Sequence, residues 1–251
     1  MIEFQTTYFS KAIGVQLGAR ILVPESGPVG KSTLYLLHGL SDDHSIWHRR
    51  SSVERYVETC EIVVVMPNGG RGFYTNAEAG PRWGDAMGPE LVSKVEEWFP
   101  VSRTADTRFI AGLSMGGYGA FRLALSNPGM YGHAASLSGA LMIGSQPVIN
   151  PLRGTEYRDE LTRVFGVNPV GTEHDLLTLV TRCDLVNQLP KLWMDCGRSD
   201  FLFDDNETFH TRLTEIKVPV TYKVSDGSHD WQYWNRLLPD VLRWMGFSPA
   251  D

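Results

Sequence analysis

The sequence predicts an α/β fold in which a mostly parallel sheet is covered by helices on both faces. From about residue 33 onward, strand-like and helix-like segments alternate, which is typical of parallel strands joined by helical crossovers. Residues 62–66 read Ile-Val-Val-Val-Met, a β-branched run that is apolar on both faces, as in a central parallel strand. The 251 residues, 42% of them hydrophobic and 21% charged, are sufficient to bury a core of this kind.

The elements are expected in the following order. Two antiparallel edge strands open the chain at 2–10 and 12–23. Prolines and glycines interrupt the alternation between 141 and 189, and this segment is expected to form a short cap over the strand ends within a single domain, 1–251. Further strands are expected at 33–37, 62–66, 108–113, 133–137, 191–196 and 218–224, and helices at 45–59, 89–99, after 114, at 205–216 and at 230–245.

The pattern Gly112-x-Ser114-x-Gly116 lies between an expected strand and an expected helix. In this setting the pattern indicates a sharp turn that exposes the serine hydroxyl as a nucleophile. Strand and helix nearly touch at such a turn, so the positions two residues before and after the serine must lack side chains. The pattern therefore predicts acyl transfer through a serine ester.

A serine hydroxyl needs a base and a group that orients the base. On a strand–turn–helix of this kind the acid and then the histidine follow the serine in the chain. His229 lies in the loop between the last strand and the last helix and is predicted as the base, whereas His210 falls inside a helix. Asp200 directly follows the strand 191–196 and is predicted as the acid, with Asp226, three residues before His229, as its rival.

The oxyanion of the tetrahedral intermediate needs two donors. The backbone amide of Met115, directly after the serine, is one candidate. The other is the amide of Leu40, because His38-Gly39 ends the first central strand and the glycine lets the backbone turn closely. Bulky residues near the strand ends suggest a small, aromatic-walled acyl site. Its candidate lining residues are Leu40, Trp47, Phe73, Tyr74, Trp231 and Met142.

Composition excludes several other functions. The net charge of −6 argues against nucleic acid as a partner, and no apolar run approaches the roughly 20 residues needed to cross a bilayer. The three cysteines, 60, 183 and 196, are far apart, so neither disulfides nor a zinc site is predicted. No metal or cofactor is expected. Residues 1–7 contain no secretory signal pattern, so a cytoplasmic location is expected unless a leader has been removed. The sequence is compatible with a homo-oligomer.

Several motifs together resemble the esterase D-like branch of the α/β hydrolases, especially small bacterial tributyrin-type carboxylesterases. The branch also includes S-formylglutathione hydrolases, feruloyl esterases and mycolyltransferases. The motifs cover nearly the whole chain: Leu36-Leu37-His38-Gly39-Leu40-Ser41, Ser45-Ile46-Trp47, Arg50-Ser51-Ser52, Pro67-Asn68, Phe73-Tyr74-Thr75, Gly112-Leu113-Ser114-Met115-Gly116-Gly117-Tyr118-Gly119-Ala120 and Gly227-Ser228-His229-Asp230-Trp231-x-Tyr233-Trp234.

The resemblance implies an α/β-hydrolase fold without a cofactor, with Ser114, Asp200 and His229 as the triad and Leu40 and Met115 at the oxyanion hole. It implies a carboxylesterase for short-chain or small aromatic acyl esters. Two alternatives are a thioesterase like the S-formylglutathione hydrolases and an acyltransferase with a sugar or alcohol acceptor. Ser41-Asp42-Asp43 follows the oxyanion segment where S-formylglutathione hydrolases usually carry a cysteine, which weakens the thioesterase reading.

Overall fold

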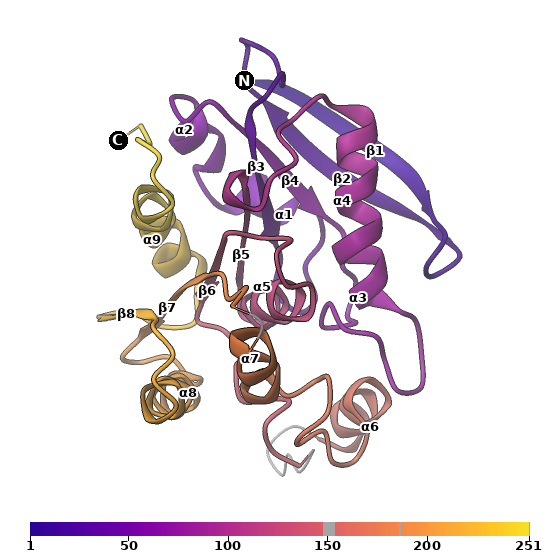
Figure 1. Cartoon of the computed structure of the whole chain (residues 1–251), viewed down its shortest axis with the longest axis vertical. Coiled ribbons are helices and arrows are strands. Elements are labelled where there is room, and N and C mark those ends of the chain that lie inside the picture. Colours follow the sequence, from indigo (N-terminus) through magenta and orange to yellow (C-terminus); the bar gives the residue numbers. More distant parts are fainter. Residues whose placement is uncertain (148–153, 186, 251) are drawn as a thin grey trace.

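The computed structural model of the chain describes residues 1–147, 154–185 and 187–250. Within these residues an eight-stranded sheet forms the centre of the molecule, in the order β1-β2-β4-β3-β5-β6-β7-β8 (Figure 1). β1 pairs antiparallel with β2 and β2 with β4, whereas all pairs from β4 to β8 are parallel. The predicted α/β fold with an antiparallel edge is confirmed. The strands are β1 Ile2–Ser10, β2 Val15–Val23, β3 Ser32–Leu37, β4 Ile62–Pro67, β5 Arg108–Leu113, β6 His133–Leu137, β7 Lys191–Gly197 and β8 Thr221–Ser225.

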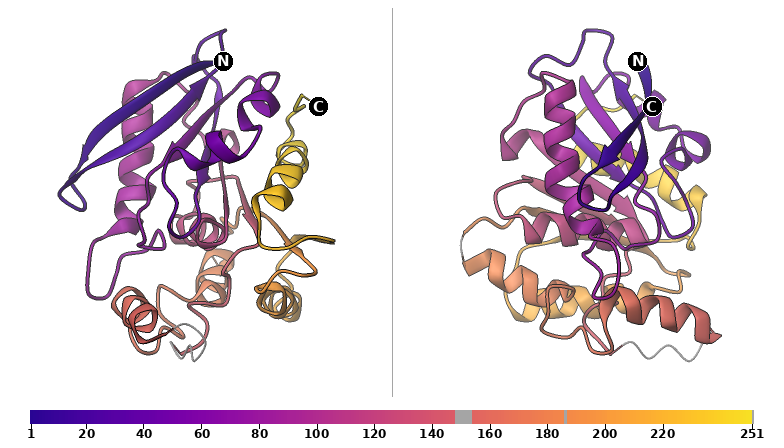
Figure 2. Two further views of the ribbon diagram at one scale, coloured as in Figure 1. Left: turned by 180° about the vertical axis from the view of Figure 1, so that it is seen from behind. Right: turned by 90° about the vertical axis from the view of Figure 1, so that its right-hand side faces the viewer.

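The central strands are buried on both faces. In β4, Val63 and Val65 belong to one apolar cluster, while Ile62, Val64 and Met66 belong to a second cluster on the opposite face. Helices α1, α2 and α9 supply the second cluster, and α4, α5, α7 and α8 supply the first. Two helical layers therefore enclose the sheet, with α2 and α9 on one side and α4 on the other (Figures 1 and 2). The helices are α1 Ile46–Arg50, α2 Val53–Val57, α3 Trp83–Asp85, α4 Leu91–Trp98, α5 Met115–Ser126, α6 Gly154–Phe165, α7 Leu176–Leu185, α8 Phe203–Glu215 and α9 Trp231–Trp244.

The helix expected at 45–59 is two short helices. Ser51 is extended between them, with φ −132° and ψ 171°. Its hydroxyl donates to the Trp47 carbonyl at 2.5 Å and accepts from the Val53 amide at 3.3 Å. Serine side chains that bond to nearby backbone groups compete with helix formation, and this competition ends the first helix.

The helix expected at 89–99 has an irregular start. α3 is followed by a π-helical turn at Ala86–Glu90, which contains Pro89, and only then by α4. Proline has no amide hydrogen and crowds the preceding turn, and a π-helical turn accommodates this disruption without ending the helix.

The expected cap segment, 141–189, contains α6 and α7, and its residues 148–153 and 186 lie outside the described part. α7 packs against α5. In Figure 2, α6 lies along the lower end of the molecule, away from both termini. Among the described residues, no helix is both long and apolar enough to cross a bilayer. Cys60, Cys183 and Cys196 are buried.

Candidate active site

The turn after β5 holds Ser114 in a strained conformation. Its φ is +53° and its ψ −116°, a region that side chains rarely occupy. A Cβ on Gly112 would lie 2.3 Å from the Gly116 carbonyl oxygen, and one on Gly116 would lie 2.6 Å from the carbonyl oxygens of Leu37 and His38. The backbones of β3, β5 and α5 therefore meet at this turn, which explains the two glycines.

Two further loops meet at the serine. One follows β7 and carries Asp200; the other joins β8 to α9 and carries His229. The amides of Arg198 and Ser199 donate to the carbonyls of Ser225 and Gly227, both at 3.0 Å. These backbone hydrogen bonds join the two loops and so fix the position of the Asp200 carboxylate relative to the His229 imidazole.

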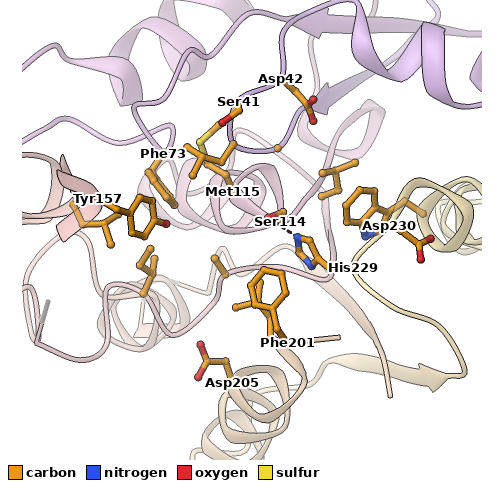
Figure 3. Close-up of a pocket in the computed structure, with 18 of the residues that line it drawn as sticks. Ser41, Asp42, Phe73, Ser114, Met115, Tyr157, Phe201, Asp205, His229 and Asp230 are labelled. Atoms are coloured by element: carbon orange, nitrogen blue, oxygen red, sulfur yellow. Dashed lines mark hydrogen bonds between the residues drawn. The ribbon is translucent and has the colours of Figure 1, made fainter. Parts of the chain in front are cut away.

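Ser114, His229 and Asp200 form a continuous hydrogen-bonded series. His229 Nε2 lies 3.0 Å from Ser114 Oγ, as Figure 3 shows. His229 Nδ1 lies 2.9 and 3.0 Å from the two carboxylate oxygens of Asp200. A carboxylate can only accept, so Nδ1 carries the proton and Nε2 is free to accept one from the serine.

Asp200 is ionised despite being buried. Burial alone would raise the pKa of its carboxyl, but the hydrogen bond and charge of His229 outweigh this effect. The Leu202 amide, which donates to Asp200 Oδ1 at 2.8 Å, adds to the stabilisation. The net result is a pKa below the usual range for aspartate. The rival Asp226 has a side chain 99% exposed and faces Arg198.

The loop after β3 lies beside the serine. A Cβ on Gly39 would come within 3.7 Å of Ser114 Cβ, so Leu40 directly follows a point of contact with the turn. His38 supports this loop from below, because its Nδ1 donates to the Gly39 carbonyl at 2.8 Å and its Nε2 accepts from the Gly69 amide at 2.9 Å. Met115 is the first residue of α5, where the amide hydrogen has no partner within the helix. Leu40 and Met115, the two expected oxyanion donors, line the same cavity as Ser114.

A cavity of about 970 Å³ opens at the serine. Of the expected site residues, Leu40, Phe73, Ser114, Met115, His229 and Trp231 line it, and Asp200 lies behind His229. Apolar residues form one end, and charged groups from α1, α8, the N-cap of α9 and the loop after β3 form the rim (Figure 3). The apolar set is Phe73, Leu113, Met115, Ile143, Tyr157 and Leu161, and the charged set is Asp42, Arg50, Asp205 and Asp230.

Three expected lining residues lie elsewhere. Trp47 is 1% exposed, and its Nε1 donates to the Leu37 carbonyl at 2.9 Å; it supports Trp231 from behind, ring edge to face. Tyr74 is fully buried, and its hydroxyl donates to the His38 carbonyl at 3.0 Å. Met142 packs in the core. All three bulky side chains fill the protein interior instead of lining the cavity.

Sequence reasoning missed the contributions of the cap and of α8. Tyr157 and Leu161 come from α6, Phe201 comes from the turn before α8, and Asp205 comes from the first turn of α8. Leu161 lies one turn of helix after Tyr157, so spacing could have shown that they share a face, but no pattern indicates that this face turns to Ser114. Among the described residues, no group of three or more metal-binding side chains gathers at one point.

Comparison with known proteins places the chain in a family. Residues 10–245 match the family model named Esterase. The chain belongs to the esterase family. It is 28% identical to an acetyl esterase of Caldicellulosiruptor saccharolyticus over 98% of both chains.

Solved structures agree with this esterase assignment. A fluorophosphonate-binding serine hydrolase, FphF, of Staphylococcus aureus superposes with a TM-score of 0.86 at 30% identity, covering 98% of this chain and 99% of that one. An S-formylglutathione hydrolase (FrmB) of the same organism gives 0.86 at 32% identity, covering 97% and 98%. This esterase has the α/β-hydrolase fold and is a carboxylic ester hydrolase that acts on a small-molecule ester.

Proposed function

We propose that this protein is a serine carboxylesterase that cleaves short-chain or small aromatic acyl esters through an acyl-enzyme intermediate. The observation that carries the proposal is the series from Ser114 Oγ through the His229 imidazole to the Asp200 carboxylate, with spacings of 3.0 and 2.9 Å. These separations are within the hydrogen-bonding reach that a nucleophile and its base require.

In the first half-reaction, Ser114 Oγ attacks the ester carbonyl while His229 Nε2 takes the hydroxyl proton. The new bond makes the carbonyl oxygen an oxyanion, which accepts hydrogen bonds from the amides of Leu40 and Met115. When the intermediate collapses, the bond to the alcohol oxygen breaks and His229 gives its proton to that oxygen. Asp200 stays ionised throughout and stabilises the imidazolium.

Water carries out the second half-reaction. His229 takes a proton from the water as its oxygen attacks the acyl carbon, and the same two amides hold the second oxyanion. Collapse breaks the bond to Ser114 Oγ, which recovers its proton from His229. The carboxylic acid leaves and the enzyme returns to its starting state.

The division of the cavity supports the substrate class. Its apolar end offers aromatic and aliphatic side chains for an acyl group, while the charged rim suits a polar alcohol. Asp42 and Asp205 line this rim, and burial raises the pKa of both carboxyls.

A panel of p-nitrophenyl esters tests the proposal. We expect the highest kcat/KM with acetate, butyrate or a small aromatic acyl group, and a steep fall with longer chains. Ser114→Ala, which changes one side-chain oxygen, is the matched control and should fold normally without turning over any ester. A preference for dodecanoate would contradict the proposed acyl site.

A thioester is the second candidate substrate, favoured by the similarity to the S-formylglutathione hydrolase of S. aureus. The acidic rim argues against it, because glutathione carries two carboxylates that would approach Asp42 and Asp205. We expect S-formylglutathione to be hydrolysed with a lower kcat/KM than p-nitrophenyl acetate; the reverse order would make the thioesterase reading the better one.

A further inference from the structure

Arg71 joins two parts of the cavity wall that are far apart in the sequence. Its Nη1 donates to Ser41 Oγ at 2.7 Å. Its Nε and Nη2 donate to the two carboxylate oxygens of Glu160 at 2.6 and 2.7 Å. All three nitrogens of the guanidinium group are used, and the pair with Glu160 is the planar two-point contact that arginine makes best.

The two partners of Arg71 belong to different segments at the cavity: the loop after β3 and the helix α6. Ser41 lines the cavity directly after Leu40, the proposed oxyanion donor. Glu160 lies on α6, between Tyr157 and Leu161, which form part of the apolar end (Figure 3). One side chain therefore touches the loop that would stabilise the oxyanion and the helix that would contact the acyl group.

The loop that carries Arg71 is tightly constrained. A Cβ on Gly72 would lie 1.8 Å from the Trp83 ring, and one on Gly69 would lie 2.3 Å from the Tyr74 ring. Phe73 and Tyr74 both have positive φ, 51° and 53°, a conformation that is kept only where the surroundings enforce it. The base of the Arg71 side chain is consequently fixed.

The Ser41 turn, by contrast, needs support. The Asp42 amide donates to the Gly39 carbonyl at a long 3.3 Å, and Ser41 has a φ of +73°. A serine in this region is strained, so the turn can relax to other conformations when nothing holds its side chain. The hydrogen bond from Arg71 Nη1 to Ser41 Oγ holds the side chain in place.

We propose that Arg71 is a positioning residue that fixes the oxyanion loop through Ser41 and the acyl-binding helix α6 through Glu160. The inference rests on the proposed esterase function and adds the element that couples the acyl pocket to the oxyanion hole. The Ser41 contact governs the rate for every ester. The Glu160 contact governs only esters whose acyl chain is long enough to reach α6.

Kinetics with p-nitrophenyl acetate and hexanoate test this division. We expect Ser41→Ala to lower kcat/KM about 10-fold or more on both esters, because small displacements of a reacting geometry cost up to about 100-fold. Glu160→Gln keeps the shape of the side chain but loses its charge, and should lower kcat/KM for hexanoate several-fold while sparing acetate. Arg71→Ala should show both defects, and Arg71→Lys, which cannot make the two-point contact, should not restore the hexanoate rate.

Double variants and controls make the result decisive. In an Arg71→Ala background, Ser41→Ala and Glu160→Gln should add little, because their shared partner is already gone. Arg212→Ala breaks an exposed arginine–glutamate pair on α8 and should leave both rates unchanged. The proposal would be overturned if Ser41→Ala and Glu160→Gln lowered kcat/KM as much in the Arg71→Ala background as in the wild type. It would also be overturned if Glu160→Gln lowered kcat/KM equally for both esters. Wild-type turnover of acetate separately tests the esterase function, and melting temperatures exclude simple unfolding.

Discussion

Two buried carboxyl groups near the end of β7 are held in different protonation states by their surroundings. The pKa of Asp200 is lowered, because His229 and the Leu202 amide outweigh the effect of burial. Burial raises the pKa of Asp195 to about 7, although hydrogen bonds with Trp193 and Tyr233 act in the opposite direction; Trp193 Nε1 donates to Asp195 Oδ2 at 2.9 Å. Asp200 differs in that it forms a direct hydrogen bond with an imidazole, which can carry a positive charge, and this fits the role proposed for it.

Replacing each of the two rival acids separates their roles. Asp200→Asn keeps the shape of the side chain but favours the wrong imidazole tautomer, so kcat should fall by about 10⁴-fold. Asp226→Asn is the matched control, because that side chain is 99% exposed, and its kcat should stay within about twofold of wild type. A larger loss in Asp226→Asn than in Asp200→Asn would show that the acid is assigned wrongly.

Asp195 gives the protein a specific pH dependence of stability. Between about pH 4, where an unfolded aspartate ionises, and about pH 7, the native state keeps the Asp195 proton. The native state then binds more protons than the unfolded state, so the Asp195 contribution to the free energy of unfolding falls as pH rises. Above about pH 7 this loss is complete.

Asp195→Asn removes that contribution because an amide does not ionise. In urea unfolding, the free energy of unfolding of the variant should therefore rise relative to that of the wild type as pH increases from about 4 to 7. Above about pH 7 the difference between the two should be constant. Asp226→Asn, on the exposed loop, should run parallel to wild type. A parallel curve for Asp195→Asn as well would contradict the raised pKa.

At the scale of elements, the sharp turn between β5 and α5 depends on close backbone contact. Gly116→Ala would push a methyl group to 2.6 Å from two carbonyl oxygens of the β3 end. We expect a loss of about 2 kcal/mol or more in the free energy of unfolding, together with loss of activity. Gly80→Ala, where the nearest atom is a side-chain methyl at 3.2 Å, is the control. A Gly116→Ala variant as stable as wild type would show that the turn is not so constrained.

Most elements could be predicted from the sequence because their patterns are local. β5 and β6 lie where expected, and β4 differs by one residue, since apolar β-branched runs are a strong strand signal. The errors fall where side chains act on their own backbone. Ser51 ends α1 by bonding to the Trp47 carbonyl, and Pro89 sits in a π-helical turn; periodicity carries neither signal.

At the scale of the whole molecule, the site combines segments from most of the chain. The serine, acid and histidine come from the turn after β5 and the loops after β7 and β8, and strand order alone predicts that these three loops lie at one edge of the sheet. The cavity wall is different. Tyr157 of α6 lines it, and Trp47 does not, because lining depends on how the cap packs and on which aromatic residues fill the core.

The proposed mechanism requires that Ser114 form an ester with the acyl group of the substrate. Acid quenching during turnover of p-nitrophenyl butyrate, followed by intact-mass and peptide mass spectrometry, tests it directly. We predict that the wild-type protein carries one added butyryl group, located on Ser114. The Ser114→Ala variant should carry no adduct, and its kcat should be lower than that of the wild type by about 10⁵-fold or more. An acyl group on another residue, or normal turnover by Ser114→Ala, would contradict the account.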